Sequence, residues 1–368
     1  MKTISIPLFA AAAVLAGSAF FASESQAQGC VAVRGGACLG GPHIGGEHGS
    51  GYLQAGDWQA SLSYRWLHSD RHFVGDQENK TRFQIGNEVI NDSHFFDLSA
   101  LYAITERFNV GLTLPFVHSY RTSWYEHDNA TRHGSSAGGL GDVRAGVYAW
   151  IIDPAKNPKG NLSVGIGPKF PTGDYRATDT FYTTNGPVIG YVDQSIQPGD
   201  GGWGFTTELF GFYSIMPKLS AYVQGSYLFN PENDNGTPTR TGRARGNPFE
   251  QTMSIPDQYL GRAGLSYILW EPWGVALSLG GRIEGVPVRD ALGDSDGFRR
   301  PGYAISIEPG LSVMKNGWTF GVTTPVAVYR NRERSVADER FTATSGVYRH
   351  GDAAFADFIV TANIAKQF

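Results

Sequence analysis

The chain has 368 residues, of which only 17% are charged, and its formal net charge is −4. A balance of 30 basic against 34 acidic residues gives no support for nucleic-acid binding. Forty-eight glycines, 13% aromatic residues and only four methionines fit a chain of many short strands and argue against a helical protein.

The first 27 residues predict a cleaved secretory signal peptide. Lys2 supplies a positive charge, residues 4–21 form an apolar core, and Ser25-Gln26-Ala27 places small residues at positions −3 and −1 of the cleavage site. A retained membrane anchor is the alternative, but Pro7 and Gly17 interrupt the apolar run. No run of about 20 apolar residues follows, so no spanning helix is predicted for the mature chain.

Residues 28–56 are predicted to form a Gly-rich N-terminal segment that precedes the main domain, residues 57–368. An exported chain meets an oxidising compartment, where Cys30 and Cys38 favour a disulfide-bonded loop. A lipid-modified Cys30 is the alternative, although Gln28 stands where a small or apolar residue is expected. Two cysteines with no neighbouring ligand cluster are weak evidence for zinc, so neither a metal site nor a cofactor is predicted.

Twelve segments of the main domain alternate apolar and polar residues with the period of a β-strand. The first places Trp58, Ala60, Leu62, Tyr64 and Trp66 on one face, and Gln59, Ser61, Ser63 and Arg65 on the other. We expect the apolar face to contact lipid and the polar face to line a wet interior. The segments lie near residues 57–67, 94–104, 108–118, 142–151, 161–170, 203–213, 219–229, 258–268, 275–285, 303–313, 318–328 and 355–368.

The connections between these segments alternate in length. The short ones are residues 105–107, 152–160, 214–218, 269–274 and 314–317, and the long ones are residues 68–93, 119–141, 171–202, 230–257, 286–302 and 329–354. Short turns on one side, long loops on the other and an even strand number are typical of outer-membrane barrels. The predicted fold is therefore an all-β, transmembrane, antiparallel up-and-down β-barrel with short periplasmic turns and long extracellular loops. The predicted location is the outer membrane of a Gram-negative cell.

The last segment ends on an aromatic residue. Its apolar face is formed by Phe358, Val360, Ala362, Ile364, Lys366 and Phe368. A strand at the end of a chain needs a partner for its open edge, and a sheet that closes on itself provides one. Such a strand resembles the closing strand of bacterial outer-membrane barrels. Lys366 departs from the apolar pattern, and we expect its amine to reach the membrane interface.

Tryptophan gives an independent indication. Seven of the eight tryptophans fall at or near predicted strand ends, where an amphipathic ring favours the lipid headgroup level: Trp58, Trp66, Trp150, Trp203, Trp270, Trp273 and Trp318. Only Trp124 lies inside a long loop.

Eleven charged side chains fall on the polar faces of the segments. They are predicted to line the pore: Arg65, Asp97, Asp142, Arg144, Lys169, Glu208, Arg262, Arg282, Glu284, Glu308 and Asp357. Mixed charge in a narrow lumen is expected to pair into a salt-bridged network. A plugged, structural interior is the alternative to a narrow polar conduit. The conduit is favoured because small residues on the same faces leave room, namely Gly111, Gly165, Gly167, Gly264 and Gly280.

Prolines gather near the outer ends of the segments. Pro115, Pro168 and Pro325 lie inside such ends, and Pro171 and Pro287 lie just beyond them. Because proline lacks the N–H that a ladder needs, we expect loosened strand pairing there. One hypothesis is that these breaks open a gap in the wall for an apolar solute. The other interpretation is that the prolines only end strands.

The long loops are rich in arginine. They hold Arg240, Arg243, Arg245, Arg289, Arg299, Arg300, Arg330, Arg332, Arg334, Arg340 and Arg349. Solvated loop charge is the default interpretation, and such groups also match the phosphates of outer-membrane lipid and lipopolysaccharide or an anionic solute. A calcium loop at residues 294–297 is not predicted, because Leu292 and Tyr303 occupy ligand positions. The expected partners are therefore lipid and a small-molecule solute, and the oligomeric state is not predicted.

Three motifs carry a resemblance to a known family. They are Gly139-Leu140-Gly141-Asp142-Val143-Arg144, then Gly167-Pro168-Lys169-Phe170-Pro171-Thr172-Gly173-Asp174, then Gln197-Pro198-Gly199-Asp200-Gly201-Gly202-Trp203, with Glu308-Pro309-Gly310-Leu311 near the end. This pattern resembles the outer-membrane family labelled meta-cleavage phenol-degradation pathway protein, which is grouped with channels for aromatic and other hydrophobic compounds. The resemblance covers about half of the chain and implies a barrel that takes up small organic molecules.

Three functions remain open at this point. A channel for small molecules is favoured, and a structural or surface-interaction barrel is the main alternative. A lipid hydrolase needs a serine held by a histidine, and Asn91-Asp92-Ser93-His94 has those residue types. Because neighbouring residues of a strand point to opposite faces, we do not expect Ser93 and His94 to meet, and no catalytic residue is predicted.

Overall fold

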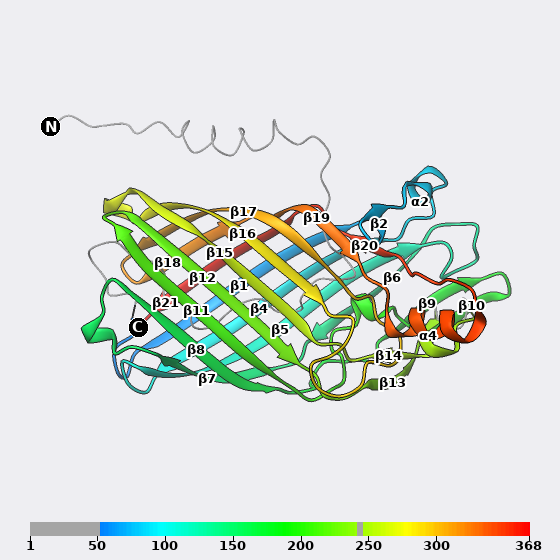
Figure 1. Ribbon diagram of the computed structural model, residues 1–368, viewed down its shortest axis with the longest axis horizontal. Coiled ribbons are helices and arrows are strands. Elements are labelled where there is room, and N and C mark those ends of the chain that lie inside the picture. The colour runs from blue at the N-terminus through cyan, green and yellow to red at the C-terminus, as the bar shows by residue number, and fades with distance from the viewer. Residues whose placement is uncertain (1–51, 241–245) are drawn as a thin grey trace.

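The alternating segments form antiparallel strands that close into a barrel, as the computed structural model shows for residues 52–240 and 246–368 (Figure 1). The predicted signal peptide and the segment with Cys30 and Cys38 lie outside these described residues. The barrel strands are β1 (Trp58–Ser69), β4 (Ile90–Ala103), β5 (Phe108–Ser123), β6 (His133–Leu140) continued by β7 (Arg144–Trp150), β8 (Gly160–Lys169), β11 (Gly204–Met216), β12 (Leu219–Phe229), β15 (Gln258–Trp270), β16 (Val275–Val286), β17 (Gly302–Lys315), β18 (Trp318–Thr323) continued by β19 (Val326–Arg332), and β21 (Ile359–Gln367).

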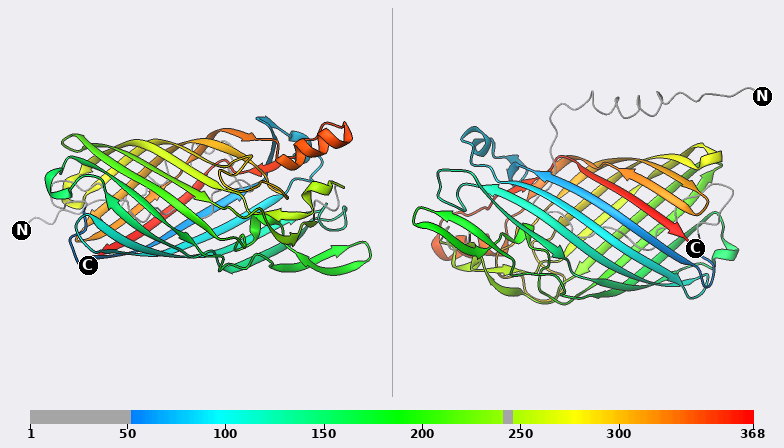
Figure 2. Two further views of the ribbon diagram at one scale, coloured as in Figure 1. Left: turned by 60° about the horizontal axis from the view of Figure 1, so that its bottom comes forward. Right: turned by 180° about the vertical axis from the view of Figure 1, so that it is seen from behind.

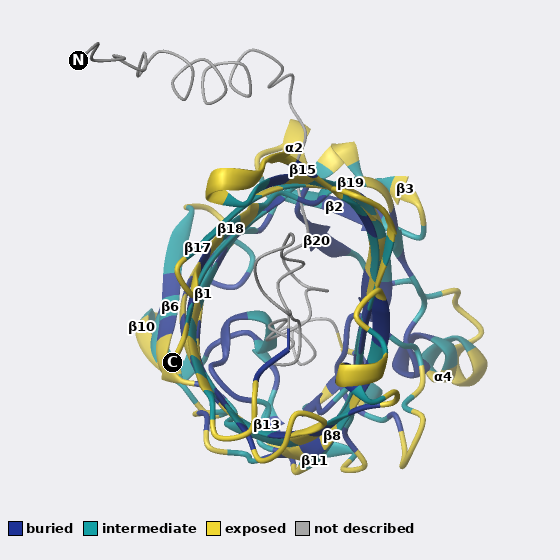
Figure 3. Ribbon diagram, turned by 90° about the vertical axis from the view of Figure 1, so that its left-hand side faces the viewer, coloured by how far each residue is buried: buried dark blue, intermediate teal, exposed yellow. Residues whose placement is uncertain are grey.

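Each barrel strand pairs with the one before it and the one after it, and β1 pairs with β21 to close the ring (Figure 3). The terminal residue Phe368 exchanges two backbone hydrogen bonds with Trp58, which are 2.8 and 3.3 Å long. The described residues thus form a closed barrel of twelve antiparallel strands, when β6 with β7 and β18 with β19 are each taken as one strand. The predicted fold class and strand number are confirmed.

Side chains along the strands alternate between an outer and an inner face. In β4, the side chain of Asp97 is 6% exposed, whereas the next residue, Leu98, is 48% exposed. Large apolar side chains therefore cover the outside of the ring, and charged side chains are buried inside it. This is the arrangement of a wall between hydrocarbon and a hydrated lumen.

Short connections gather at one end of the barrel, with the C-terminus, and long connections gather at the other (Figure 2). We call these the short-turn end and the long-loop end. The long loops carry β2 (Arg71–Val74), β3 (Gln77–Glu78), α2 (Lys80–Gln84), β9 (Thr178–Thr183), β10 (Gly186–Tyr191), η2 (Gln194–Ile196), β13 (Asp234–Pro238), η3 (Pro248–Glu250), β14 (Thr252–Ser254), α4 (Val336–Ser345) and β20 (Ala353–Phe355), and two short turns carry η1 (Pro154–Lys156) and η4 (Glu271–Trp273).

The helices within residues 52–240 and 246–368 are short. None of the helices in the described residues is long and apolar enough to cross a membrane. The longest, α4, begins with a capping box in which Ser335 and Asp338 bond to each other's backbone N–H, and it ends at Gly346 in a left-handed conformation.

Two barrel strands are interrupted on the way to the long-loop end. Residues 141–143 separate β6 from β7, and residues 324–325 separate β18 from β19. Pro325 lies in the second gap, and the β7–β8 ladder has no pair opposite Pro168. The loosened pairing predicted at these two prolines is confirmed. At Pro115 the β4–β5 ladder is continuous, but on the other side of β5 residues 114–115 have no ladder partner in β6 or β7, so the loosened pairing predicted there is confirmed as well.

The tryptophan prediction holds for most residues. Trp58, Trp203, Trp270, Trp273 and Trp318 are between 42% and 55% exposed on the outer face. It is wrong for Trp150, which is 4% exposed. This indole belongs to the inner face of β7 and packs edge-on against Tyr52, with ring centroids 4.9 Å apart. Tyr52 and Leu53 thus fill the barrel interior together with Trp150, Phe210 and Leu101.

Lys366 lies on the outer face of β21, as predicted. Its amine donates a 2.9 Å hydrogen bond to the backbone oxygen of Asn316 in a short turn, and it lies 5.5 Å from the ring centre of Trp318. The charge therefore reaches the polar rim of the short-turn end, where it does not meet hydrocarbon.

Candidate functional site in the barrel lumen

The eleven predicted pore-lining residues all lie away from the exposed outer face. Seven of them are buried, and Asp142, Arg144, Glu208 and Arg262 are half-buried. One prediction of position is wrong. Asp357 does not belong to the last strand, because it lies between β20 and β21 at the long-loop end. There it pairs with Arg71, 3.0 Å away, and with Arg330.

A network of charges lines the lumen along three neighbouring strands. Arg262 of β15 lies 2.9 Å from Glu308 of β17, and Arg282 of β16 lies 2.8 Å from Glu284 and 3.9 Å from Glu308. The pairing of lumen charges that was predicted from the sequence is confirmed here. The network holds three neighbouring strands in register from inside the barrel.

A second pair joins strands on the opposite part of the wall. Arg144 of β7 lies 3.9 Å from Asp97 of β4, on the two sides of β5. Glu208 of β11 accepts a 3.2 Å hydrogen bond from the hydroxyl of Tyr148, which belongs to β7.

Four of the five predicted lumen-facing glycines, Gly165, Gly167, Gly264 and Gly280, do not widen the lumen. A Cβ at Gly165 would lie 2.4 Å from the ring of Tyr148, and one at Gly264 would lie 2.7 Å from the Tyr222 hydroxyl. Tyrosine rings therefore occupy the space that was interpreted as room for a solute. At Gly167 the reason is different, since a Cβ there would lie 1.8 Å from the backbone oxygen of Ala145.

The three motifs of the resemblance meet at the interruption between β6 and β7. Asp142 accepts 3.0 Å hydrogen bonds from the backbone N–H groups of Gly173 and Asp200. The Thr172 hydroxyl donates to the Gly141 oxygen at 2.8 Å and accepts from the Val143 N–H at 2.9 Å. The residues at the break in the ladder thus form hydrogen bonds with residues from two other segments. We call this set of contacts the Asp142 junction.

Lys169 completes this junction. Its amine lies 2.5 Å from the carboxylate of Asp200, and Lys169 is only 2% exposed. The sequence predicted Lys169 and Asp142 as lumen residues but missed Asp200 as their partner. Asp200 belongs to the motif Gln197–Trp203, and this motif was the one sequence feature that could have identified it.

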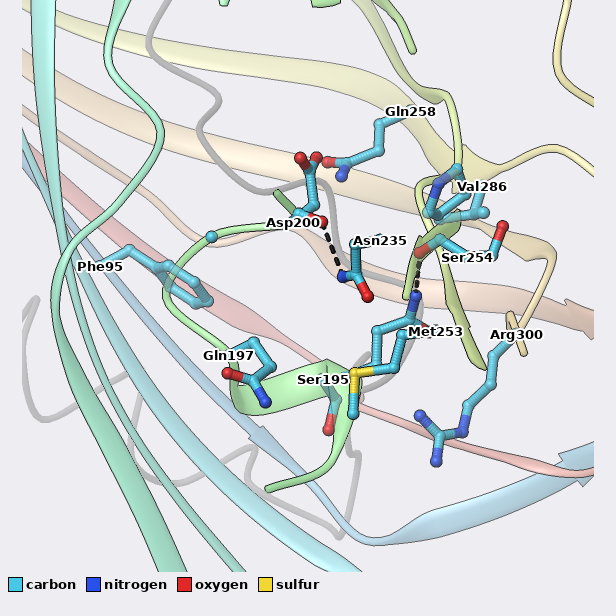
Figure 4. Close-up of a pocket in the computed structure, with 13 residues that line it drawn as sticks. Phe95, Ser195, Gln197, Asp200, Asn235, Met253, Ser254, Gln258, Val286 and Arg300 are labelled. Carbon is cyan, nitrogen blue, oxygen red and sulfur yellow. Dashed lines mark hydrogen bonds between the residues drawn. The ribbon is translucent and has the colours of Figure 1, made fainter. Parts of the chain in front are cut away.

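Residues 193–202 fold into the lumen from the long loop between β8 and β11, and they carry η2 (Figure 4). Asp193 anchors this inward segment. Its two carboxylate oxygens accept hydrogen bonds of 2.8 and 2.7 Å from Arg300, and Arg121 lies 3.6 Å away. Burial by itself would raise the pKa of Asp193, but Arg121 and Arg300 hold this pKa well below its ordinary value. The anchor therefore stays charged at neutral and mildly acidic pH.

Two small cavities lie beside the inward segment. The first measures about 50 Å³ and is lined by Phe95, Asp200, Asn235, Gln258 and Arg300 among others (Figure 4). The second measures about 30 Å³ and adjoins Asp97, Arg144 and Lys169. A ring the size of benzene needs a cavity of about 150 Å³. Both cavities are therefore too small to hold an aromatic ring in this arrangement.

A larger apolar pocket lies at the wall. It measures about 570 Å³ and is lined by outer-face residues such as Val110, Val147 and Ile166, and also by Gly111 and Gly146 of the inner face. Pro168 and Gly167 line it too, so it lies at the stretch where the β7–β8 ladder has no pair. A groove of about 930 Å³ shares Val147 and Ile166 with it and continues across the outer face to β16.

The residues considered for hydrolysis do not form a catalytic site. Ser93 is 1% exposed on the inner face, whereas the His94 imidazole bonds to the Tyr64 hydroxyl at 2.9 Å on the outer face. Within residues 52–240 and 246–368, no serine hydroxyl is hydrogen-bonded to a histidine. In that same part of the chain, no group of three or more His, Cys, Asp or Glu residues is placed to hold a metal ion.

Comparison with solved structures supports the fold. The chain is similar to an outer-membrane channel from Pseudomonas putida F1, with a TM-score of 0.55 and 11% identity over 86% of this chain and 97% of the other. It is also similar to a toluene transporter from Ralstonia pickettii, with a TM-score of 0.40 and 10% identity over 88% and 92% of the two chains. At this identity the first likeness establishes the barrel architecture. No family model and no curated protein matches the sequence, so the family label stays a prediction.

Proposed function

We propose that this protein is an outer-membrane channel for small organic molecules, which pass through its charged lumen. The observation that supports the proposal is the closed wall itself, apolar outside and lined inside by paired charges such as Arg262–Glu308 and Arg282–Glu284. Such a wall separates hydrocarbon from a hydrated interior. The Pseudomonas putida protein of similar fold is named an outer-membrane channel, and we extend that role to this chain.

The inward segment, residues 193–202, acts as the gate. It occupies the lumen near the long-loop end and is held by the buried pair of Asp193 and Arg300. The cavities of about 50 and 30 Å³ beside it are too small for an aromatic ring. Opening therefore requires that this pair separate and that the segment swing out of the lumen.

A side passage between β7 and β8 gives apolar solutes access to the membrane. The missing ladder pairs beside Pro168 weaken the wall there, and an apolar pocket of about 570 Å³ lies against this stretch. Backbone pairing that is already incomplete costs little to open further. On the inner side of this stretch, Gly111 and Gly146 carry no side chain, and the Tyr148 ring lies over Gly146.

A disulfide staple across the two strands tests this route. Val147 and Ile166 are Cα partners in β7 and β8, so Val147→Cys with Ile166→Cys links the strands at the passage. All variants carry Cys30→Ser and Cys38→Ser. Uptake of radiolabelled benzyl alcohol is measured in Gram-negative cells that lack their general porins. Cells with the unstapled barrel take it up faster than cells without it, and oxidation of the staple removes this gain until a reductant is added.

The matched control links β1 and β21, which form a continuous ladder. Leu62→Cys with Ile364→Cys places the same staple on outer-face partners away from the passage. Uptake through this variant stays at the unstapled level in oxidant. Equal inhibition by both staples would contradict a passage between β7 and β8. No uptake above that of cells without the barrel would contradict the channel itself.

A structural barrel is the second candidate, and the filled lumen favours it. Tyr52, Trp150 and Phe210 pack inside near the short-turn end, and the inward segment occupies the long-loop end. A purely structural barrel predicts no uptake by the unstapled protein and no effect of either staple. The same experiment therefore separates the two candidates.

A further inference from the structure

Arg65 is a buried cation without a hydrogen-bond acceptor. It lies on the inner face of β1 and is 6% exposed. Both terminal nitrogens of its guanidinium, Nη1 and Nη2, are buried and have no hydrogen-bond partner in the described residues. The guanidinium carbon lies 4.5 Å from the ring centre of Phe95 on β4.

The neighbouring carboxylates are already paired with other arginines. Asp97 faces Arg144 at 3.9 Å, and Glu284 faces Arg282 at 2.8 Å. These four groups are the charges that act most strongly on Arg65, and two of them are positive while two are negative. No carboxylate lies within 4.0 Å of the Arg65 guanidinium among the described residues. Arg65 and these four groups together carry three positive and two negative charges. The charge of Arg65 is the one without a partner among them.

A buried guanidinium with free N–H groups is unfavourable unless an acceptor completes it. Its planar fork matches the two oxygens of a carboxylate better than it matches a single neutral acceptor. Phe95 adds an apolar surface, because it packs in a cluster with Leu67, Val117 and Ile359. A ligand with a carboxylate and an aromatic ring would therefore find two adjacent partners, the guanidinium of Arg65 and the ring of Phe95.

The position of Phe95 connects this pair to the solute route. Phe95 lines both small cavities beside the inward segment. A solute that enters when the segment moves therefore contacts Phe95, whose ring Arg65 already covers. Phe95 thus places the pair beside the two smallest cavities described above.

We propose that Arg65 and Phe95 form a subsite for the carboxylate of a small aromatic acid, about the size of benzoate. The inference rests on the proposed channel function and specifies its substrate class. The two carboxylate oxygens accept hydrogen bonds from Nη1 and Nη2 of Arg65, and the ring of the acid contacts Phe95. A neutral aromatic molecule of the same shape leaves Nη1 and Nη2 unpaired.

The test compares benzoate with benzamide, which is its neutral isostere. Calorimetry on the purified, full-length barrel in detergent measures the two dissociation constants. We expect benzoate to bind at least about tenfold more tightly, as a charge-assisted bidentate pair provides. Arg65→Gln brings the ratio of the two constants close to one, and Arg65→Lys, which keeps the charge but loses the fork, retains part of it.

The control is Arg107→Gln. It removes the same charge from the turn between β4 and β5 at the short-turn end, where Arg107 donates to the Trp150 and Ile151 backbone oxygens. Its benzoate preference matches the wild-type value. Folding of every variant is checked by the shift of the heat-modifiable band on a gel. If Arg65→Gln does not fold, the wild-type ratio still decides, because equal binding of benzoate and benzamide overturns the proposal.

The outcome is separable from that of the channel proposal. Solute release from vesicles is measured with the same preparations. Release without a benzoate preference overturns the subsite and leaves the channel in place. A benzoate preference that is the same in wild type and Arg65→Gln also overturns the subsite, because the preference then comes from another group.

Discussion

The carboxylate of Asp142, at a break in the barrel wall, accepts a 3.0 Å hydrogen bond from the backbone N–H of Asp200, which lies 58 residues further along the chain. Its other oxygen accepts from the N–H of Gly173. One side chain thus joins the wall to the segment that folds into the lumen. The gap between β6 and β7 is therefore a junction with its own hydrogen bonds, and the inward segment depends on it.

The Asp142 junction is testable by removal of one acceptor oxygen. Asp142→Asn retains only one acceptor, so one of the two backbone N–H groups loses its partner. We expect the free energy of unfolding to fall by about 1–3 kcal/mol. Urea unfolding in detergent, followed by tryptophan fluorescence, measures this. Asp174→Asn is the control, because the Asp174 carboxylate accepts only from the nearby Arg176 N–H in an exposed turn, and its effect stays within about 0.5 kcal/mol. Equal effects would contradict the junction.

The anchor of the inward segment gives a second prediction. Arg300→Gln removes one partner of a buried ion pair, which costs about 3–5 kcal/mol in such pairs. We expect the open fraction in single-channel recordings to rise by at least about tenfold, since a change of 1.4 kcal/mol already gives this factor. Arg289→Gln is the matched control. Its pair with Glu339 is exposed at the surface and contributes about 0–1 kcal/mol, so the open fraction stays unchanged.

The pH dependence of this anchor has a definite sign. The pKa of Asp193 is depressed in the folded protein, so its contribution is present above the ordinary pKa of 3.8 and is lost as pH falls through the folded value. Asp142 holds the same segment, so the test uses Asp142→Asn, in which Asp193 is the only one of these two carboxylates that can titrate. Its open fraction is the same at about pH 7 and about pH 5. A steep rise between these two values in this variant would contradict an anchor built on Asp193.

The contribution of His72 to stability, in contrast, changes at mildly acidic pH. This residue lies in β2 among the long loops, where its Nδ1 is 3.0 Å from Asp352 and its Nε2 accepts a 2.8 Å bond from the Val89 N–H. Burial lowers the pKa of His72 from the ordinary 6.5, although Asp352 raises it and Arg82 and Arg121 lower it further. The stabilising effect is present above pH 6.5 and is lost as pH falls toward the folded value.

Protonation at Nε2 also breaks the bond to Val89. We expect faster hydrogen exchange in residues 71–90 at about pH 5 than at about pH 7.5, after correction for the intrinsic rate. In His72→Gln, which does not titrate, the corrected rates at the two pH values are equal. A wild-type loop with the same corrected rates at both values would show that His72 does not control its stability.

Two glycines of the barrel predict opposite results. In Gly167→Ala the new Cβ would lie 1.8 Å from the Ala145 backbone oxygen, which cannot move without breaking the wall. We expect failure to assemble, measured as loss of the heat-modifiable folded band. Gly281→Ala is the control on the outer face, because no atom lies within 4 Å of its Cβ. Normal assembly of Gly167→Ala would mean that the close approach of β7 and β8 is not required.

The barrel was predictable because each strand has an apolar outer face and a polar inner face, which impose a period of two on the sequence. The segment predicted at 219–229 coincides with β12, and the segment predicted at 275–285 differs from β16 by one residue. Among the strands of the barrel wall, the prediction missed β6, whose sequence His-Gly-Ser-Ser-Ala-Gly-Gly-Leu carries no apolar alternation. Near the long-loop end both faces of the wall meet polar surroundings, so the periodic signal disappears there.

The lumen was predictable only in part. The inner-face position of Arg262 and Glu308 follows from strand phase, but Asp193, Asp200 and Arg300 belong to loops without a period. Trp150 shows the same limit. Its position at a strand end indicates the membrane interface, but its place in the alternation of β7 turns the side chain toward the lumen. Partners that fold into a barrel from loops are fixed by tertiary contacts, which leave no repeat in the sequence.

Release of a small sugar from vesicles tests the channel most directly. The purified, folded barrel is inserted into liposomes loaded with radiolabelled arabinose, and release is compared with that from protein-free vesicles. Our account predicts slow release through the wild-type barrel and faster release through Arg300→Gln, because the inward segment is the gate. Vesicles that contain folded barrel and retain the sugar with both proteins would contradict it.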